Sequence, residues 1–201
     1  MLLVTSLSAM DYAILMEERV SSDRSSQSVI KFQAGSTITD DFYFFSGLWF
    51  RDKLPIIYED NGRGDISNYS EYINFIDLYG GVEYSLSSWL SPYTFYEQYY
   101  DRTADNLDFF ITFGLSGMLY NDANHNVSYF SELYLARDSN VNADAFGIFG
   151  SESALKYRYK VYDQQAALYL QAVWNTDAAY TNQAQLFDGY YSTRFGIQLN
   201  F

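Results

Sequence analysis

The chain has 201 residues, which is enough for one domain with a sizeable core or for one closed sheet. Its formal net charge of −13 argues against a nucleic-acid partner, because the phosphates would repel it. The absence of cysteine excludes a disulfide framework, a thiol nucleophile and a thiolate metal site. Aromatic residues make up 20% of the chain, more than a globular core needs, and no stretch approaches the ~20 apolar residues of a spanning helix.

The first residues differ from the rest of the chain. Residues 1–9 (MLLVTSLSA) form an apolar run followed by small residues, which is typical of the end of a secretory signal peptide. Because a basic segment is missing before the apolar run, we interpret residues 1–9 as the remnant of such a signal. Residues 10–201 are then a single domain. The alternative for residues 1–9 is a short strand or an ordinary chain start.

From there on, apolar and polar residues alternate with a period of two, which is typical of β-strands. One face near residue 80 carries Ile76, Leu78 and Val82, while the other carries Asp77 and Glu83. Such segments lie at 12–20, 28–36, 42–51, 76–86, 93–101, 109–119, 127–137, 155–162, 166–175 and 192–201. The pattern predicts about ten strands, within a range of eight to twelve, each near the ~9–11 residues that cross a bilayer when tilted.

The connections between these segments alternate in length. Short ones are expected at 39–41, 87–92, 121–126 and 163–165, and long polar ones at 21–27, 52–70, 102–108, 138–153 and 175–188. Short periplasmic turns and longer outer loops are typical of an outer-membrane barrel, in which an even strand number puts both termini on the periplasmic side. The stretch 144–153 (DAFGIFGSES) admits three interpretations: an outer loop, a plug in the lumen or the head of a strand.

The last segment, STRFGIQLNF, places Phe195, Ile197, Leu199 and Phe201 on one face. With the nine other segments, this pattern resembles bacterial outer-membrane β-barrels, over the whole chain as architecture but with a sharp motif only in the final strand. In those proteins the C-terminal strand ends in Phe and is the recognition signal for the barrel-assembly machinery. The resemblance therefore implies an all-β fold, a closed antiparallel transmembrane barrel in the outer membrane, with membrane lipid and the assembly machinery as partners. Closure also satisfies every backbone polar group in lipid.

A soluble all-β barrel or sandwich is the alternative, because its strands alternate in the same way. Three features argue against it: the aromatic content, the uneven loop lengths, and the charges at successive positions on one strand face. A packed soluble core would not tolerate those charges.

If the apolar faces meet lipid, the other faces line the lumen. The predicted lumen-lining residues are Lys31, Asp77, Glu83, Glu132, Lys156, Arg158, Lys160 and Arg194, with Glu17 and Glu97 as further candidates. The basic residues concentrate on the last three strands and the acidic ones mostly on the middle strands. This basic stripe is loosely similar to that of small monomeric porins for acidic oligosaccharides. Those barrels usually have twelve strands, however, and the acidic residues opposite the stripe would weaken an anion path.

Two interpretations of the lumen stay open. Opposite charges can pair and fill a narrow interior, as buried ions require. Alternatively, they can line a wetted pore whose transverse field favours small polar solutes. A barrel of about ten strands lies between the filled eight-stranded type and the open sixteen-stranded porins.

Few residues suggest catalysis or metal binding. His125 is the single histidine and falls in a predicted periplasmic turn, away from the outer rim where barrel enzymes place their catalytic groups, so we expect no enzyme and no cofactor. In the longest loop, Asp60, Asn61 and Asp65 lie around two glycines and are candidate Ca²⁺ ligands, although an exposed acidic loop is the simpler interpretation.

These observations give two functional hypotheses. The first is a narrow porin-like channel for ions or small polar solutes. The alternative is a structural or adhesion barrel that presents acidic outer loops, above all 52–70, to a surface partner.

Overall fold

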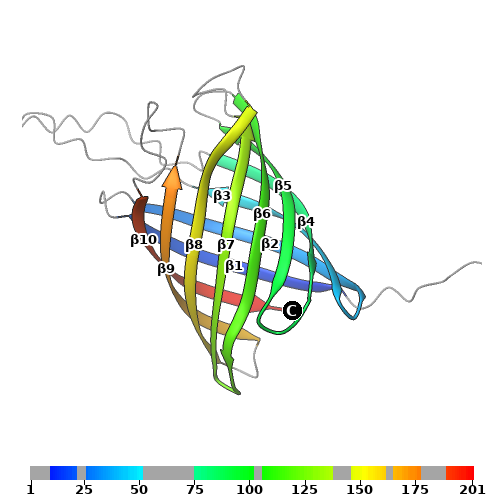
Figure 1. The fold of residues 1–201 in the computed structure, drawn as a ribbon. Helices are drawn as coiled ribbons and strands as arrows, with labels where there is room; N and C mark the ends of the chain where they lie inside the picture. Colours follow the sequence, from blue (N-terminus) through cyan, green and yellow to red (C-terminus); the bar gives the residue numbers. More distant parts are fainter. Residues whose placement is uncertain are drawn as a thin grey trace, which may run out of the picture.

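The computed structural model describes residues 10–21, 26–51, 75–101, 106–137, 146–161, 165–177 and 189–201. These residues form ten antiparallel strands in one closed barrel, in which each strand pairs with its sequence neighbours and the first pairs with the last (Figure 1). The predicted fold class and strand number are confirmed. The strands are β1 Asp11–Ser21, β2 Ser26–Thr39, β3 Phe42–Arg51, β4 Phe75–Tyr84, β5 Ser91–Asp101, β6 Asn106–Asn121, β7 His125–Arg137, β8 Phe146–Val161, β9 Ala166–Asp177 and β10 Gly189–Asn200.

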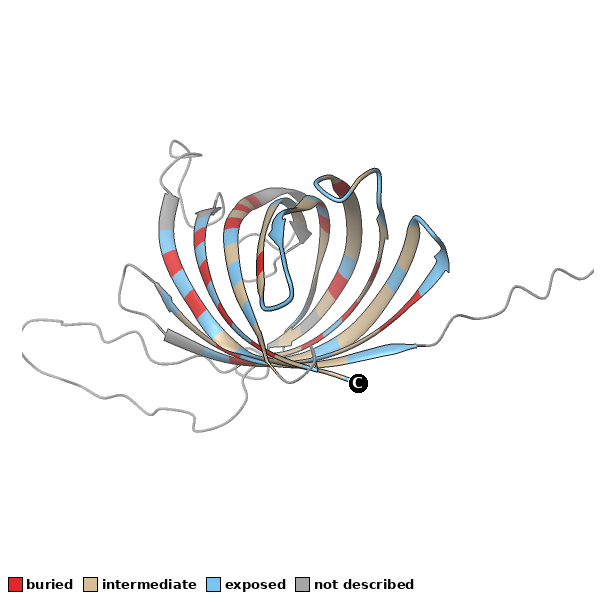
Figure 2. Ribbon diagram, turned by 90° about the horizontal axis from the view of Figure 1, so that it is seen from below, coloured by how far each residue is buried: buried red, intermediate tan, exposed pale blue. Residues whose placement is uncertain are grey.

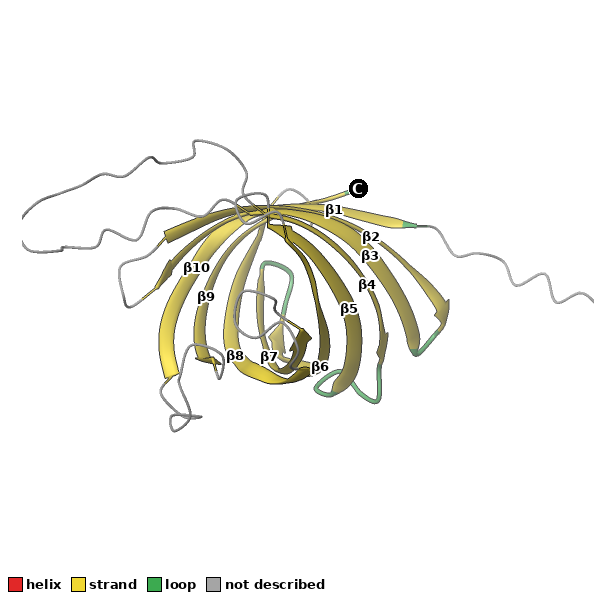
Figure 3. Ribbon diagram, turned by 90° about the horizontal axis from the view of Figure 1, so that it is seen from above, coloured by secondary structure: helices red, strands yellow, loops and turns green. Residues whose placement is uncertain are grey.

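Pairing between β1 and β10 closes the wall (Figure 3). The ladder runs from Ala13 opposite Asn200 to Ser21 opposite Ser192. Beyond its end, the Tyr12 N–H donates to the Phe201 carbonyl at 3.3 Å, and the Phe201 N–H donates to the Tyr12 carbonyl at 2.9 Å. The barrel therefore leaves no open strand edge at this seam, which is the condition for placing a sheet in lipid. Within the described ranges, no helix has the length and apolar character needed to span a membrane.

The two faces of the wall have opposite character, as the alternating colours along the strands in Figure 2 show. On β9, for example, Leu168 and Leu170 are exposed, whereas Tyr169 and Gln171 between them are buried. The residues opposite Leu170 on the two adjacent strands are Tyr157 and Phe195, which are also exposed. The outward-facing side chains thus form a continuous apolar belt.

One loop prediction is wrong. Strand β8 begins at Phe146, so the long connection expected at 138–153 does not extend over 146–153, and the strand-head interpretation is correct for these residues. Gly and Ser made this stretch look like a loop, but Ser151 and Ser153 lie in the ladder opposite Leu133 and Ser131. The hydroxyls of Ser131 and Ser153 are 2.8 Å apart. Cross-strand pairing here outweighs the local turn tendency of the sequence.

The turn between β6 and β7 is organised by one carboxylate. Asp122 accepts hydrogen bonds from the backbone N–H groups of Asn124 (2.8 Å) and His125 (2.6 Å) and from the Tyr120 hydroxyl (2.8 Å). The Tyr120 hydroxyl and then these N–H groups hold the pKa of Asp122 below its usual value. The short connection predicted here is confirmed, although His125 already belongs to β7. Residues 1–9 and the loop at 52–70 lie outside the described residues.

Inward-facing aromatic rings lie over glycines of the adjacent strand. A Cβ built on Gly114 would overlap the ring of Tyr93, and one built on Gly196 would come within 2.9 Å of the Tyr169 ring. Each of these glycines is directly opposite its tyrosine in the ladder. The absent side chain lets the ring lie flat against the wall, which fixes the hydroxyl that projects from it.

We expect the Gly114→Ala substitution to lower the free energy of unfolding by about 1–3 kcal/mol, because the new methyl group must displace the Tyr93 ring. The measurement is equilibrium unfolding in guanidinium of the protein folded into lipid vesicles. The matched control is Gly80→Ala, where the nearest atoms lie 3.8 Å from the added Cβ. Equal effects of the two substitutions would contradict the ring placement.

A second prediction concerns the outer belt. Leu170, near the middle of β9, is 53% exposed, and Leu107, near the start of β6, is 62% exposed. In lipid, the Leu170→Lys substitution should cost about 2–4 kcal/mol and Leu107→Lys about 0–1 kcal/mol, because the penalty for a charge falls toward the interface. The same unfolding assay in vesicles measures both. A negligible cost at Leu170, as for a water-exposed leucine, would refute a lipid-facing exterior.

Candidate functional site: the barrel lumen

All the sequence-predicted lumen residues lie on the inner face of the wall. The register shows this directly: Lys156 lies opposite Gln171, and Gln171 lies opposite Arg194, so the three share a face. Asp77 is completely buried on the same side. By the same register the inner face carries Lys31, Glu83, Glu132, Arg158 and Lys160, together with Glu17 and Glu97. Whether these residues line an open passage stays a prediction.

Sequence reasoning missed several inner charges, among them Arg19, Arg51 and Glu152. Arg19 and Arg51 lie inside the predicted segments 12–20 and 42–51, two residues beyond Glu17 and Trp49, so the same alternation places them on the inner face. Glu152 was hidden in the stretch interpreted as a loop. With these additions, the inner face carries seven Lys and Arg residues among the part of the chain that the structure describes: Arg19, Lys31, Arg51, Lys156, Arg158, Lys160 and Arg194.

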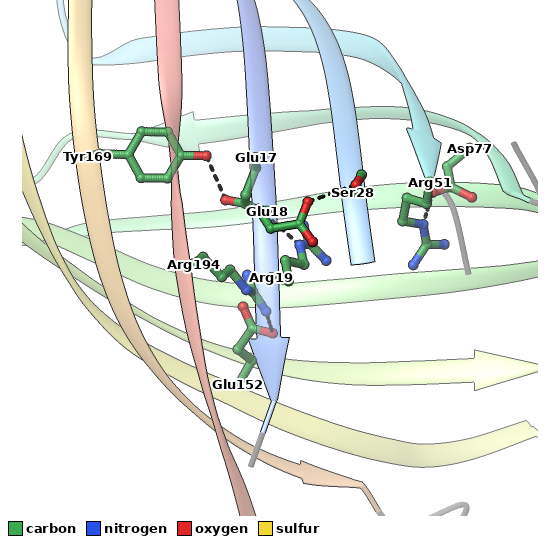
Figure 4. Close-up of polar contacts among 9 residues, drawn as sticks. All are labelled: Glu17, Glu18, Arg19, Ser28, Arg51, Asp77, Glu152, Tyr169 and Arg194. Atoms are coloured by element: carbon green, nitrogen blue, oxygen red, sulfur yellow. Dashed lines mark hydrogen bonds and ion pairs between the residues drawn. The ribbon is translucent and has the colours of Figure 1, made fainter. Parts of the chain in front are cut away.

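Three of the inner arginines form ion pairs (Figure 4). An Arg194 Nη atom lies 2.5 Å from Glu152 Oε2, and Arg19 Nε lies 2.5 Å from Glu17 Oε1. Arg51 contacts Asp77 through Nε and lies 3.5 Å from Glu97 Oε1. All the carboxylates in these pairs are buried. Such pairs are held strongly only where water is scarce and both partners are present.

Tyrosine hydroxyls hold two of the inner carboxylates in place. Glu132 accepts hydrogen bonds from Tyr93 at 2.5 Å and from Tyr134 at 2.9 Å. Glu17 accepts one from Tyr169 at 2.7 Å, although the two residues are 152 positions apart in the sequence. The bonds from Tyr93 and Tyr169 link strands that are not adjacent, because β5 and β7 both pair with β6, and β1 and β9 both pair with β10. They make the inner layer a connected polar network.

The inner lysines are placed differently from the arginines. The Lys31 ammonium lies 4.5 Å from the ring centres of both Trp49 and Tyr79, and that of Lys156 lies 4.1 Å from the Tyr169 ring centre. Among the described residues, neither lysine has a carboxylate within ion-pair distance. The aromatic faces attract these cations without neutralising them.

The lower part of the inner face, near the chain termini, is also polar. Arg158 donates to the side-chain oxygens of Asn126 (3.3 Å) and Gln198 (3.4 Å), and Lys160 donates to that of Asn121 (2.7 Å). A pocket of about 430 Å³ opens at this end of the barrel. Its lining includes Asp11, Gln33, Tyr43, Gln165, Gln198 and Asn200.

The other candidate site residues lie elsewhere. His125 is on the outer face, opposite Tyr159 in the ladder, and its Nδ1 lies 2.7 Å from the Tyr157 hydroxyl. An aromatic cluster of this kind is typical of the membrane interface. The candidate Ca²⁺ ligands Asp60, Asn61 and Asp65 lie outside the described residues. Within the described part, no group of three His, Asp or Glu residues is arranged to hold a metal ion.

The candidate assembly residues face outward. Phe195, Ile197 and Phe201 are exposed, and Leu199 lies opposite Ile14 on the same side of the seam. Their role as an assembly signal stays a prediction.

Apolar residues outside, charged residues inside and a closed ladder together decide the class of protein, since only lipid stabilises that arrangement. The chain is a transmembrane β-barrel.

Comparison with known proteins finds similarity among solved structures alone. No family model matches the sequence, and no curated protein matches it either. Among solved structures, the NanC porin is similar at 10% identity and a TM-score of 0.48, covering 95% of this chain and 99% of that one. The KdgM porin is similar at 12% identity and a TM-score of 0.48, covering 94% of this chain and 99% of that one. OmpT, an outer membrane protein of Vibrio cholerae, is similar at 10% identity and a TM-score of 0.41, covering 96% of this chain and 97% of that one. At these values the likeness concerns barrel architecture and identifies no solute.

The pair formed by Arg194 and Glu152 gives a test of how dry the lumen is. We expect the Arg194→Met substitution to lower the free energy of unfolding by about 3–5 kcal/mol, because it leaves a buried carboxylate without its partner. The double substitution Arg194→Met with Glu152→Met should recover most of that loss. A loss of at most ~1 kcal/mol for Arg194→Met would instead show that water screens the pair.

Proposed function

We propose that the barrel is a narrow channel for ions or small polar solutes. The observation that carries this proposal is the segregation of charge: seven basic residues in the described part of the chain face inward, in a chain with a net charge of −13. A barrel interior that only needed filling could use apolar side chains, which cost less to enclose than ions. Charges that line a passage replace part of the water shell of a passing solute.

The arrangement of these charges supports a passage that is constricted rather than wide. The ion pair between Arg194 and Glu152 and the hydroxyl contacts to Glu132 project side chains into the inner space from β5, β7, β8 and β10. The pocket near the termini gives a polar mouth at one end. We propose no catalytic role, because His125 lies on the outer face beside Tyr157 and away from the inner carboxylates.

The test is conductance of the purified, folded protein in planar lipid bilayers. We expect discrete steps of small amplitude. Removing the constriction with Glu152→Ala and Arg194→Ala together should give larger steps, because both side chains project into the lumen. The matched control is Phe195→Ala on the outer face, which should leave the step size unchanged.

Absence of steps from protein that is folded in the same bilayers would refute the channel. That result would favour the second candidate function, a barrel that anchors outer loops. The observation in its favour is the set of inner ion pairs, which could also fill the interior. Deletion of residues 52–70 would then be expected to abolish binding of the cells to a surface partner.

A further inference from the structure

We propose that the lumen holds a binding site for a small anion between Lys31 and Lys156. This inference rests on the proposed function in that it names the ion class of the same lumen, but the site itself does not require a through passage. It is argued from how the inner charges are partnered, from the chemistry of lysine and from the position of the two side chains.

The inner charges fall into two sets. Arg19, Arg51 and Arg194 each contact a carboxylate directly. Lys31 and Lys156 have aromatic rings as their recorded partners and, among the described residues, no carboxylate within ion-pair distance. This is unexpected in a chain with 25 acidic residues. The positive charge of the lysines is therefore not cancelled by contact.

The acidic residues nearest to the lysines already have hydrogen-bond or ion-pair donors of their own. Glu17, Glu97 and Glu132 act electrostatically on Lys31, and Glu17 also acts on Lys156. Glu17, however, is bound by Arg19 through one oxygen and by Tyr169 through the other. Glu97 contacts Arg51, and Glu132 accepts bonds from two tyrosines. These carboxylates are held away from the lysine ammonium groups by other bonds.

The two lysines approach the same space from different parts of the wall. Lys31 is on β2 and Lys156 on β8. The Trp49 ring beside Lys31 also lies under the Arg19 guanidinium, 5.5 Å from its centre, and Arg19 pairs with Glu17, which accepts a hydrogen bond from the Tyr169 beside Lys156. A lysine ammonium has three N–H donors. An aromatic ring attracts the positive charge but offers no lone pair to accept a conventional hydrogen bond from these donors. An anion between them would supply hydrogen-bond acceptors to both.

Arg158 provides an independent indication. It lies on β8 two residues from Lys156, on the same inner face, and its Nε atom is buried without a hydrogen-bond partner among the described residues. Its other nitrogens bond to the neutral amides of Asn126 and Gln198. A third cation without a neutralising carboxylate therefore flanks the same region. The chemistry fits a small inorganic anion such as a halide.

The experiment uses Trp49, whose ring lies against Lys31, as an internal reporter. The other two tryptophans, Trp89 and Trp174, are exposed and can be replaced by Phe to leave Trp49 as the single emitter. Fluorescence quenching is measured on the full chain folded in lipid vesicles, at constant ionic strength with potassium gluconate. Iodide is the anionic quencher, and acrylamide is the neutral quencher that reports accessibility.

We expect iodide to quench Trp49 efficiently. The Lys31→Gln substitution should lower the iodide quenching constant by about fourfold, the factor that one unit charge at about 5 Å supplies in water, while acrylamide quenching stays the same. Lys156→Gln should lower it in the same direction, and Lys31→Arg should restore it. The control is Lys160→Gln, which should have no effect because Lys160 is bonded to Asn121 and to the Asp122 carbonyl at the turn.

The proposed site would be refuted if the iodide quenching constant were unchanged by both lysine substitutions. It would also be refuted if that constant changed in parallel with the acrylamide quenching constant. Failure of both quenchers to reach Trp49 would overturn it as well. Failure of the channel is a separate result, seen as missing conductance steps. Iodide quenching that depends on Lys31 and Lys156 would stand in that case and would identify an anion site in a closed lumen.

Discussion

The constraint on which the whole structure depends is that lipid offers no hydrogen-bond partners to a backbone. A sheet in that environment has to close, and the pairing of β1 with β10 does so from Ala13 to Ser21. Once the sheet is closed, every strand has one face toward lipid and one toward the interior. The alternation along the chain is therefore a direct consequence of the solvent, and so is the enclosure of lysine, arginine and carboxylate groups on the inner side.

Closure also explains which parts of the molecule could be predicted from the sequence. Because the period of two persists through a whole strand, Phe195 and Ile197 predict an outward face, and Lys156 and Arg158 predict an inward one. The prediction failed where the pattern was short or resembled a loop. Arg19 and Arg51 stand near the ends of their strands, where few further residues mark the inner face, and Glu152 lies among Gly and Ser.

The contacts inside the lumen could not be predicted by any rule of spacing. Glu17 meets Tyr169 only because β1 and β9 flank the same strand, β10, after the barrel has closed. Likewise, Tyr93 reaches Glu132 across β6, over a glycine that leaves room for its ring. Alternation gives the face of a residue but not its height on the wall, and height decides which charges meet.

Arginine and lysine have different partners on the inner face of the barrel. A planar guanidinium suits a buried carboxylate, and Arg19, Arg51 and Arg194 are used in that way. Lysine is a compact charge that binds water strongly, and enclosing it without water or a counter-ion is costly. Lys31 and Lys156 are held against aromatic rings without a carboxylate partner among the described residues. Water or an anion must therefore provide the missing interaction at their level of the barrel. On the same inner face, the enclosed arginines are thus stabilised by ion pairs and the two lysines by aromatic rings.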